Sequence, residues 1–191
     1  MRTNKLLIVG GVTVIILVVY FGTKNGYLSV RNAEISQPAL SGNSVPSSPP
    51  SILGVGQKAP DFKLTTLDSK EFRLVDKKGK TVILFGMAGW CSTCIPEGRN
   101  LTKIKEEYSD KGVEIIGVAF TKGDNDNFLK EYKEVGGIDI PIALDTDNVA
   151  QKYNLTRLET TYIINKDGVI TYKDEQITSY EDYKKELDKI I

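Results

Sequence analysis

The sequence predicts an α/β domain in which helices cover both faces of a central mixed sheet. Residues 81–86 and 113–120 are continuous apolar runs, as expected of strands buried on both faces. Segments with apolar residues at helical spacing follow these runs, and the chain ends in a hairpin and a helix. A domain of about 140 residues can bury roughly two-thirds of its surface, so it needs no disulfide to fold.

The first half of the domain is predicted to open with a hairpin. Its strands are residues 62–64 and 72–74, joined by a turn at 67–70. The first apolar run should lead into a helix over residues 91–108. The apolar side chains expected on the inner face of this helix are Ile95, Leu101, Ile104 and Tyr108.

The second half is predicted to add a helix, an edge strand and a short helical segment. Residues 124–135 have helical spacing, with four apolar side chains: Phe128, Leu129, Tyr132 and Val135. Pro141 interrupts the strand expected over residues 138–144. That strand should lie at an edge, because proline has no N–H to donate to a neighbouring strand. One or two helical turns are expected over residues 147–153.

A hairpin and a capped helix are predicted to close the domain. Strands over residues 161–164 and 169–172 flank an Asn-Lys-Asp-Gly sequence, which is a strong turn signal. Ser179 should cap the last helix, because a serine side chain satisfies free amide groups at a helix start. The side chains that this helix is expected to bury are Tyr183, Leu187 and Ile190.

The N-terminal region has a different character. Residues 6–21 carry no charge and would span about 24 Å as a helix, somewhat less than a ~30 Å hydrocarbon core. We therefore predict a transmembrane signal anchor over residues 1–22, with a cleaved signal peptide as the alternative. Residues 23–55 are rich in Ser, Pro and Gly and should form a disordered linker before the domain of residues 56–191.

The composition excludes several kinds of function. Lysine plus arginine equals aspartate plus glutamate at 25 each, which argues against a nucleic-acid binder. The chain has no histidine, so imidazole metal sites, serine–histidine triads and cysteine–histidine pairs are excluded. Two cysteines cannot form a four-thiolate zinc site within one chain. No cofactor and no resident metal are predicted.

The two cysteines lie in the segment Trp90-Cys91-Ser92-Thr93-Cys94, between a buried strand and a helix. Cys91 is expected at the helix N-terminus, where free amide groups stabilise a thiolate, the form that attacks disulfides. Cys94 lies one turn further on and can resolve a mixed disulfide by attacking Cys91. We therefore interpret the pair as a redox-active dithiol, the catalytic centre of a thiol–disulfide oxidoreductase.

Three other interpretations of the pair are open. A zinc half-site would need a second chain to complete it. A structural disulfide closing so small a loop would stabilise little. The third is two unrelated buried thiols. If the protein were instead a non-catalytic binding module, Cys91 would be unreactive towards alkylating reagents.

Several segments together resemble the extracytoplasmic thioredoxin-like family of the TlpA and ResA type. They are residues 56–62 (GQKAPDF), Gly79-Lys80 before the first apolar run, WCSTC with Glu97, and residues 160–168 (TTYIINKDG). The resemblance implies a thioredoxin-like fold, a membrane anchor, and reduction or exchange of protein disulfides outside the cytoplasm. Apocytochrome c as a substrate and a membrane thiol-transfer protein as electron donor are further implications, because cytochrome c maturation is a frequent role in that family.

The predicted orientation rests on this chemistry. Two basic residues precede the apolar segment and two follow it, so the positive-inside rule does not decide. Disulfides persist outside the cytoplasm. A single-pass protein of the cell membrane with an extracytoplasmic C-terminal domain is therefore expected.

The resemblance also implies roles for single residues. Glu97 would assist proton transfer at the pair, the alternative being a carboxylate on the helix surface. Phe85 occupies the position where ordinary thioredoxins bury an acid, so Glu97 is the candidate for that proton. Trp90 would shield Cys91 and contact substrate, the alternative being a half-buried structural aromatic.

Two positions depart from the family pattern. Arg99 stands where the family usually has proline. Glu159 replaces the family's cis-proline, in the loop that faces the cysteines and contacts substrate through Glu159 and Thr160. We expect the Leu158–Glu159 peptide to be trans, because a non-proline cis peptide costs about 3 kcal/mol. Glu97 and Glu159 should both approach the pair and raise the thiol pKa.

Proteins of similar chemistry or fold have other activities, which are alternatives to a reductase. A disulfide oxidase or isomerase would differ only in redox poise. A thiol peroxidase is disfavoured, because Ala88 stands where a threonine precedes a peroxidatic cysteine by three residues. A copper-delivery protein of similar fold would need a histidine.

Overall fold

The computed structural model describes residues 53–191, which form a five-stranded mixed sheet and a separate two-stranded sheet. The strands are β1 (Lys63–Thr65), β2 (Glu71–Arg73), β3 (Thr81–Met87), β4 (Val113–Ala119), β5 (Ile142–Leu144), β6 (Thr160–Ile164) and β7 (Ile170–Asp174). The α-helices are α1 (Cys94–Tyr108), α2 (Asp126–Gly136), α3 (Val149–Lys152) and α4 (Tyr180–Leu187), and 3-10 turns occupy Leu74–Lys77 and Ser109–Lys111. The predicted α/β class is confirmed.

The central strand of the large sheet is β3. In the order β5-β4-β3-β6-β7, it pairs in parallel with β4 and antiparallel with β6. All seven residues of β3 are buried, which its continuous apolar sequence predicted. Strand β5 lies at the edge as expected but begins only after Pro141, so the strand predicted over 138–144 was too long at its start.

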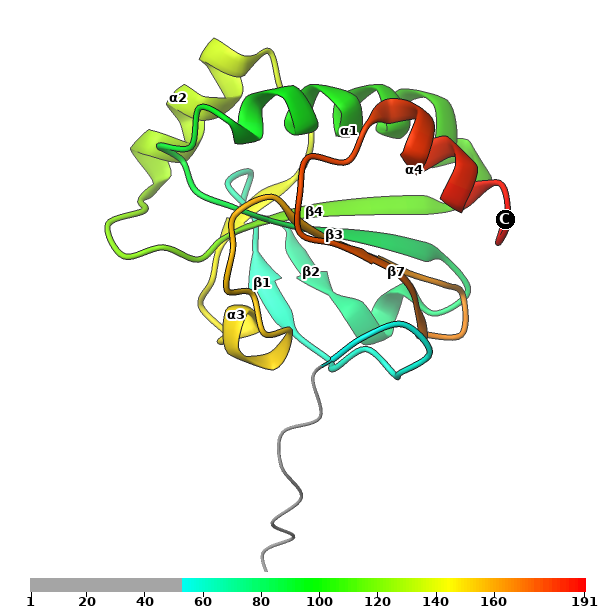
Figure 1. Cartoon of the computed structure of the whole chain (residues 1–191). Helices are drawn as coiled ribbons and strands as arrows, with labels where there is room; N and C mark the ends of the chain where they lie inside the picture. The colour runs from blue at the N-terminus through cyan, green and yellow to red at the C-terminus, as the bar shows by residue number, and fades with distance from the viewer. Residues whose placement is uncertain (1–52) are drawn as a thin grey trace, which may run out of the picture. The chain divides into compact units, whose positions relative to one another are not determined.

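Two apolar cores lie on opposite faces of the sheet. Helices α1, α2 and α4 cover one face, while α3 and the β1–β2 hairpin cover the other (Figure 1). Successive β3 side chains alternate between them: Ile83 and Phe85 join the core under α1, whereas Val82 and Leu84 join the core against the hairpin. The strand is therefore buried from both sides.

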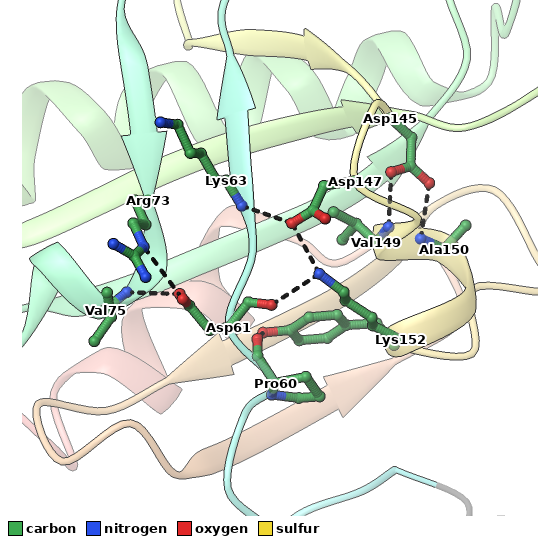
Figure 2. A network of polar contacts seen from close by, with 11 residues as sticks. Pro60, Asp61, Lys63, Arg73, Val75, Asp145, Asp147, Val149, Ala150 and Lys152 are labelled. Atoms are coloured by element: carbon green, nitrogen blue, oxygen red, sulfur yellow. Dashed lines mark hydrogen bonds and ion pairs between the residues drawn. The ribbon is translucent and has the colours of Figure 1, made fainter.

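Aspartate side chains fasten the hairpin layer to α3 (Figure 2). Asp147 accepts hydrogen bonds from the Lys63 backbone N–H at 2.9 Å and from Lys152 Nζ at 2.8 Å. Asp145 accepts from two backbone N–H groups at the start of α3, at 2.7 and 2.9 Å. Nearby, Asp61 accepts from the Val75 N–H at 3.0 Å. These bonds satisfy free amides at a helix start and hold residues 61–63 in place.

The first described segment pairs with the tip of the β6–β7 hairpin. Gly56 N–H donates to the Ile170 carbonyl at 2.8 Å, and Ala59 N–H donates to the Gly168 carbonyl at 2.9 Å. Strand β6 runs towards this tip from Thr160, which pairs with Gly86 near the end of β3. Segment 56–59 therefore joins the end of the sheet opposite to the one where β3 leads into α1.

The structure corrects parts of the predicted helices. Helix α1 begins at Cys94, three residues later than predicted, because Ser92 and Thr93 form a turn instead. Helix α2 begins after Asn125, whose side chain accepts two backbone N–H groups. Phe128 and Val135 are exposed, at 45% and 67%, so only two of the four apolar α2 side chains face the core.

The remaining helical predictions agree more closely with the structure. Leu101, Ile104 and Tyr108 of α1 are buried, while Ile95 is partly buried. Ser179 caps α4 by accepting the Asp182 N–H, and the helix buries two of the three predicted side chains. Ile190 lies beyond the end of α4 and is partly buried.

The predicted anchor over residues 1–22 and most of the predicted linker lie outside the described residues. Within residues 53–191, no helix combines the length and apolar character needed to cross a membrane.

Candidate active site

The two cysteines are joined in a disulfide at the junction of β3 and α1. Their sulfurs are 2.09 Å apart and their Cα atoms 5.3 Å apart. Cys91 lies in the loop after β3 and is 3% exposed, whereas Cys94 is the first residue of α1 and is fully buried. Cys91 is therefore the less deeply buried of the two cysteines.

The sequence predicted that Cys91 would be the first residue of the helix. In the structure, Cys91 instead precedes α1, which begins at Cys94. The expected electrostatic contact is nevertheless present, because the Cys94 N–H donates to Cys91 Sγ at 3.1 Å. Thr93 Oγ1 lies 3.4 Å from the same sulfur. Amide and hydroxyl donors at a helix start stabilise a thiolate in the reduced protein.

Glu97 is fully buried in the first turn of α1, so the alternative of a surface carboxylate is wrong. Its Oε1 accepts hydrogen bonds from Thr161 Oγ1 at 2.8 Å and from the Tyr183 hydroxyl at 2.6 Å. Burial raises the pKa of Glu97 to about 7, against the lowering effect of these two hydrogen bonds. The side chain can therefore take up or release a proton near neutral pH.

Three elements create this environment. Glu97 comes from α1, Thr161 from β6 and Tyr183 from α4. Phe85 is fully buried in β3 and pairs in register with Thr161, so the position that holds an acid in ordinary thioredoxins is apolar here. The sequence marked Tyr183 only as a core residue and Thr161 only as part of a strand. Their hydroxyls as partners of Glu97 were missed.

Glu159 lies beside the disulfide. One of its carboxylate oxygens and the two sulfurs all lie within 4.8 Å of one another. Its Oε1 is buried and has no hydrogen-bond partner among residues 53–191. The backbone has a φ of +67°, and its N–H donates to the Gly86 carbonyl at 2.9 Å. No peptide bond in residues 53–191 is cis, which confirms the trans Leu158–Glu159 peptide.

The other two residues expected to contact substrate differ in exposure. Trp90 is 61% exposed, which contradicts a half-buried structural role, and its Nε1 donates to Thr121 Oγ1 at 2.9 Å. Asp124 accepts from the Thr121 hydroxyl at 2.7 Å and from the Gly89 N–H at 2.8 Å, which fixes the loop before Cys91. Thr160 is buried, and its hydroxyl donates inward to the Arg157 carbonyl at 2.7 Å.

Comparison with known proteins decides the family. Residues 54–191 match the family described as Redoxin. The chain belongs to the Redoxin family. The thiol-disulfide oxidoreductase ResA of Geobacillus kaustophilus is 34% identical over 139 residues, which cover 72% of this chain and 79% of that protein. The thioredoxin-like protein YneN of Bacillus subtilis is 35% identical over 116 residues, covering 60% and 68% of the two chains.

Solved structures agree on the fold of this Redoxin-family protein. A putative thiol:disulfide interchange protein DsbE from Chlorobium tepidum has a TM-score of 0.64 at 21% identity and covers 72% of this chain and 97% of that one. The fold is thus thioredoxin-like, and the protein is a thiol–disulfide oxidoreductase of the ResA and TlpA type. The Cys91–Cys94 pair is the dithiol that such chemistry needs.

Proposed function

We propose that the protein reduces disulfides of protein substrates outside the cytoplasm, held at the cell membrane by residues 1–22. The observation that carries the reductase direction is the Glu159 carboxylate within 4.8 Å of both sulfurs. A carboxylate beside a thiolate disfavours the second negative charge and so destabilises the reduced pair. A dithiol that is less stable in its reduced form passes its electrons to substrate more readily.

In the proposed reaction, the Cys91 thiolate attacks one sulfur of the substrate disulfide. A bond forms between Cys91 Sγ and that sulfur, and the other substrate sulfur leaves as a thiolate that takes up a proton. The Cys94 thiol then loses its proton and attacks Cys91 Sγ, which releases the second substrate sulfur. Two electrons have moved to the substrate, and the protein is left with its disulfide closed, as in the structure.

Glu97 is the residue we assign to the proton of this second step. Its pKa of about 7 allows it to accept a proton from one thiol and release it later at neutral pH. The hydroxyls of Thr161 and Tyr183 hold Oε1 in place, whereas Oε2 is buried without a hydrogen-bond partner in residues 53–191 and is the oxygen we assign to the proton. Trp90, exposed beside Cys91 in the sequence, is the side chain we expect to contact the substrate.

The location and partners belong to the same proposal. The uncharged segment 6–21 and the likeness to ResA support a membrane tether, and disulfides persist outside the cytoplasm. Apocytochrome c is the proposed substrate, and a membrane thiol-transfer protein would return the electrons. Protease added to intact cells or spheroplasts should digest residues 56–191; full protection would refute this topology.

Mixed-disulfide trapping tests the proposed substrates. In a Cys94→Ala variant, Cys91 can attack a substrate but the complex cannot be resolved, so substrates should remain bound through a reducible link. The matched control is the double variant Cys91→Ala/Cys94→Ala, which should capture nothing. Alkylation of the reduced wild-type protein near pH 6 should label Cys91 before Cys94, because Cys91 is the less deeply buried of the two.

A disulfide oxidase is the second candidate, because one observation favours it. The Cys94 N–H that donates to Cys91 Sγ stabilises a thiolate and thus the reduced form. The reduction potential separates the two directions. We expect a reduction potential of about −270 mV, as in thioredoxin. A reduction potential of about −120 mV, as in a strong oxidase, would reverse the proposed direction.

A further inference from the structure

The disulfide and the Glu159 carboxylate together contain the donor atoms of a metal site. Cys91 Sγ, Cys94 Sγ and one Glu159 oxygen lie within 4.8 Å of one another, and all three residues are buried or partly buried. Thiolate sulfur and carboxylate oxygen are both common zinc ligands, and cysteines separated by two residues have a spacing that zinc sites use. We propose that the reduced protein binds one Zn²⁺ through Cys91, Cys94 and Glu159.

The geometry requires only a small adjustment. Zinc–sulfur bonds of about 2.3 Å and zinc–oxygen bonds of about 2.0–2.2 Å in a tetrahedron place neighbouring ligand atoms roughly 3.5–3.8 Å apart. The Glu159 oxygen is already within 4.8 Å of both sulfurs. Once the sulfur–sulfur bond is broken, the two sulfurs separate to a similar distance. Three protein ligands leave the fourth position open to water or to another thiol.

The charge of the reduced site favours a divalent cation. Two thiolates and the Glu159 carboxylate would place three negative charges in one buried cluster. The Glu159 charge also contributes to the raised pKa of Glu97, so the field of this carboxylate extends into the site. One Zn²⁺ neutralises two of the three charges. At neutral pH its binding to the two thiols releases up to two protons and changes no oxidation state.

The conformation of Glu159 supports a ligand role. A φ of +67° is unfavourable for a residue with a Cβ, and glutamate lacks the short side chain that eases it for asparagine. The Gly86 carbonyl accepts a hydrogen bond from the Glu159 N–H at 2.9 Å, which holds the backbone in this conformation.

The same residue has a buried Oε1 without a hydrogen-bond partner in residues 53–191. Strained backbone and unpaired buried polar atoms are concentrated at functional sites. A metal bound at the sulfurs would give the Glu159 carboxylate a ligand role at this site. The proposed reductase activity does not require a metal, so zinc binding would be a further property of the protein. Zinc binding and disulfide formation would use the same two sulfurs and would therefore exclude each other.

Zinc titration of the full-length protein in detergent tests the site. Reduced protein, freed of metal under anaerobic conditions, should bind one Zn²⁺ per chain in competition with a chromophoric chelator. Zinc should also protect both cysteines from alkylation. The oxidised protein should bind none, because its sulfurs are engaged in the disulfide. X-ray absorption of the complex should show two sulfur ligands with the remainder oxygen.

Variants of Glu159 identify the third ligand. Glu159→Gln should weaken zinc binding at least about tenfold, since even residues that only support zinc ligands change metal affinity 10–100-fold. Glu159→Asp keeps a carboxylate, and its zinc affinity should lie between those of the wild type and Glu159→Gln. Glu181→Gln, an exposed site on α4, is the matched control and should leave the affinity unchanged. Circular dichroism establishes that each variant is folded.

Three results would overturn the proposal. In the first, the reduced wild-type protein retains no stoichiometric zinc. In the second, the Glu159→Gln variant binds zinc as tightly as the wild type. In the third, one zinc binds per two chains, which would indicate that the metal bridges the dithiols of two chains. Disulfide reduction measured in zinc-free buffer is a separate readout. Failure of the zinc site therefore leaves the proposed reductase activity to be judged independently.

Discussion

Glu97 and Glu159 are two acids in different surroundings, one in the first turn of the helix that begins at Cys94 and the other beside the disulfide. The Glu97 carboxylate is buried with two hydroxyl donors on one oxygen, on regular α-helical backbone. Glu159 lies in a loop with a left-handed backbone. Each carboxylate has one buried oxygen without a partner in residues 53–191, Oε2 in Glu97 and Oε1 in Glu159. The surroundings of Glu97 favour reversible proton binding, whereas Glu159 is held in a backbone conformation that is unfavourable for a residue with a Cβ.

The largest expected effect concerns the charge on Glu97. Its pKa is raised from 4.5 to about 7 in the folded protein, so between these pH values the unfolded chain has lost a proton that the folded chain retains. The contribution of Glu97 to the free energy of unfolding is therefore greatest below pH 4.5 and falls as pH rises to about 7, by about 3 kcal/mol in total. In Glu97→Gln this loss should be absent.

Denaturant unfolding of the oxidised protein at several pH values measures this effect. The disulfide keeps both cysteines from titrating, so the difference between wild type and variant isolates Glu97. Parallel pH profiles for the two proteins would show that burial does not raise the Glu97 pKa.

The next largest effect is expected from removing a hydroxyl donor of Glu97. Tyr183→Phe removes the 2.6 Å hydrogen bond to Oε1 and should destabilise the protein by about 1–3 kcal/mol. Because this bond lowers the pKa of Glu97, its loss should move that pKa above 7. The Glu97 side-chain carboxyl resonance, followed through a pH titration, reports the shift.

Tyr108→Phe is the matched control for this experiment. It removes a 2.8 Å hydrogen bond from a tyrosine to Asp188, near the C-terminus of the chain and with no contact to Glu97. A comparable pKa change at Glu97 in both variants would mean that the Tyr183 bond has no specific influence.

The smallest effect concerns the backbone of Glu159. Glycine adopts a positive φ without steric cost, so Glu159→Gly should stabilise the protein by about 1 kcal/mol and also removes the unpaired oxygen. Ser69→Gly, at a φ of +62° in an exposed turn, tests the backbone contribution alone. A Glu159→Gly variant less stable than wild type would show that the carboxylate stabilises the oxidised fold.

Sequence patterns predicted the parts of the molecule that depend on local chemistry. The apolar runs identified β3 and β4, Pro141 the edge position of β5, and Ser179 the start of α4. The exposure of Phe128 was not predictable, because it depends on how far α2 extends past the sheet.

The candidate site was predicted in part. The spacing and position of Cys91 and Cys94 indicated a redox pair, which the disulfide and the Redoxin match support. The surroundings of Glu97 depend on contacts with β6 and α4, more than 60 residues further along the chain. No local pattern encodes such contacts. The replacement of a proline by Glu159 was visible, but its left-handed backbone was not.

The pairing of segment 56–59 with the tip of the β6–β7 hairpin fixes where the chain enters the domain. The chain enters at one end of the large sheet, and the disulfide lies beyond the other end of β3. Seven strand residues separate these ends by about 20 Å. Whatever precedes residue 53 is therefore attached at a point remote from the reactive sulfurs, and the entry of the chain does not occupy the surface through which a substrate would reach Cys91.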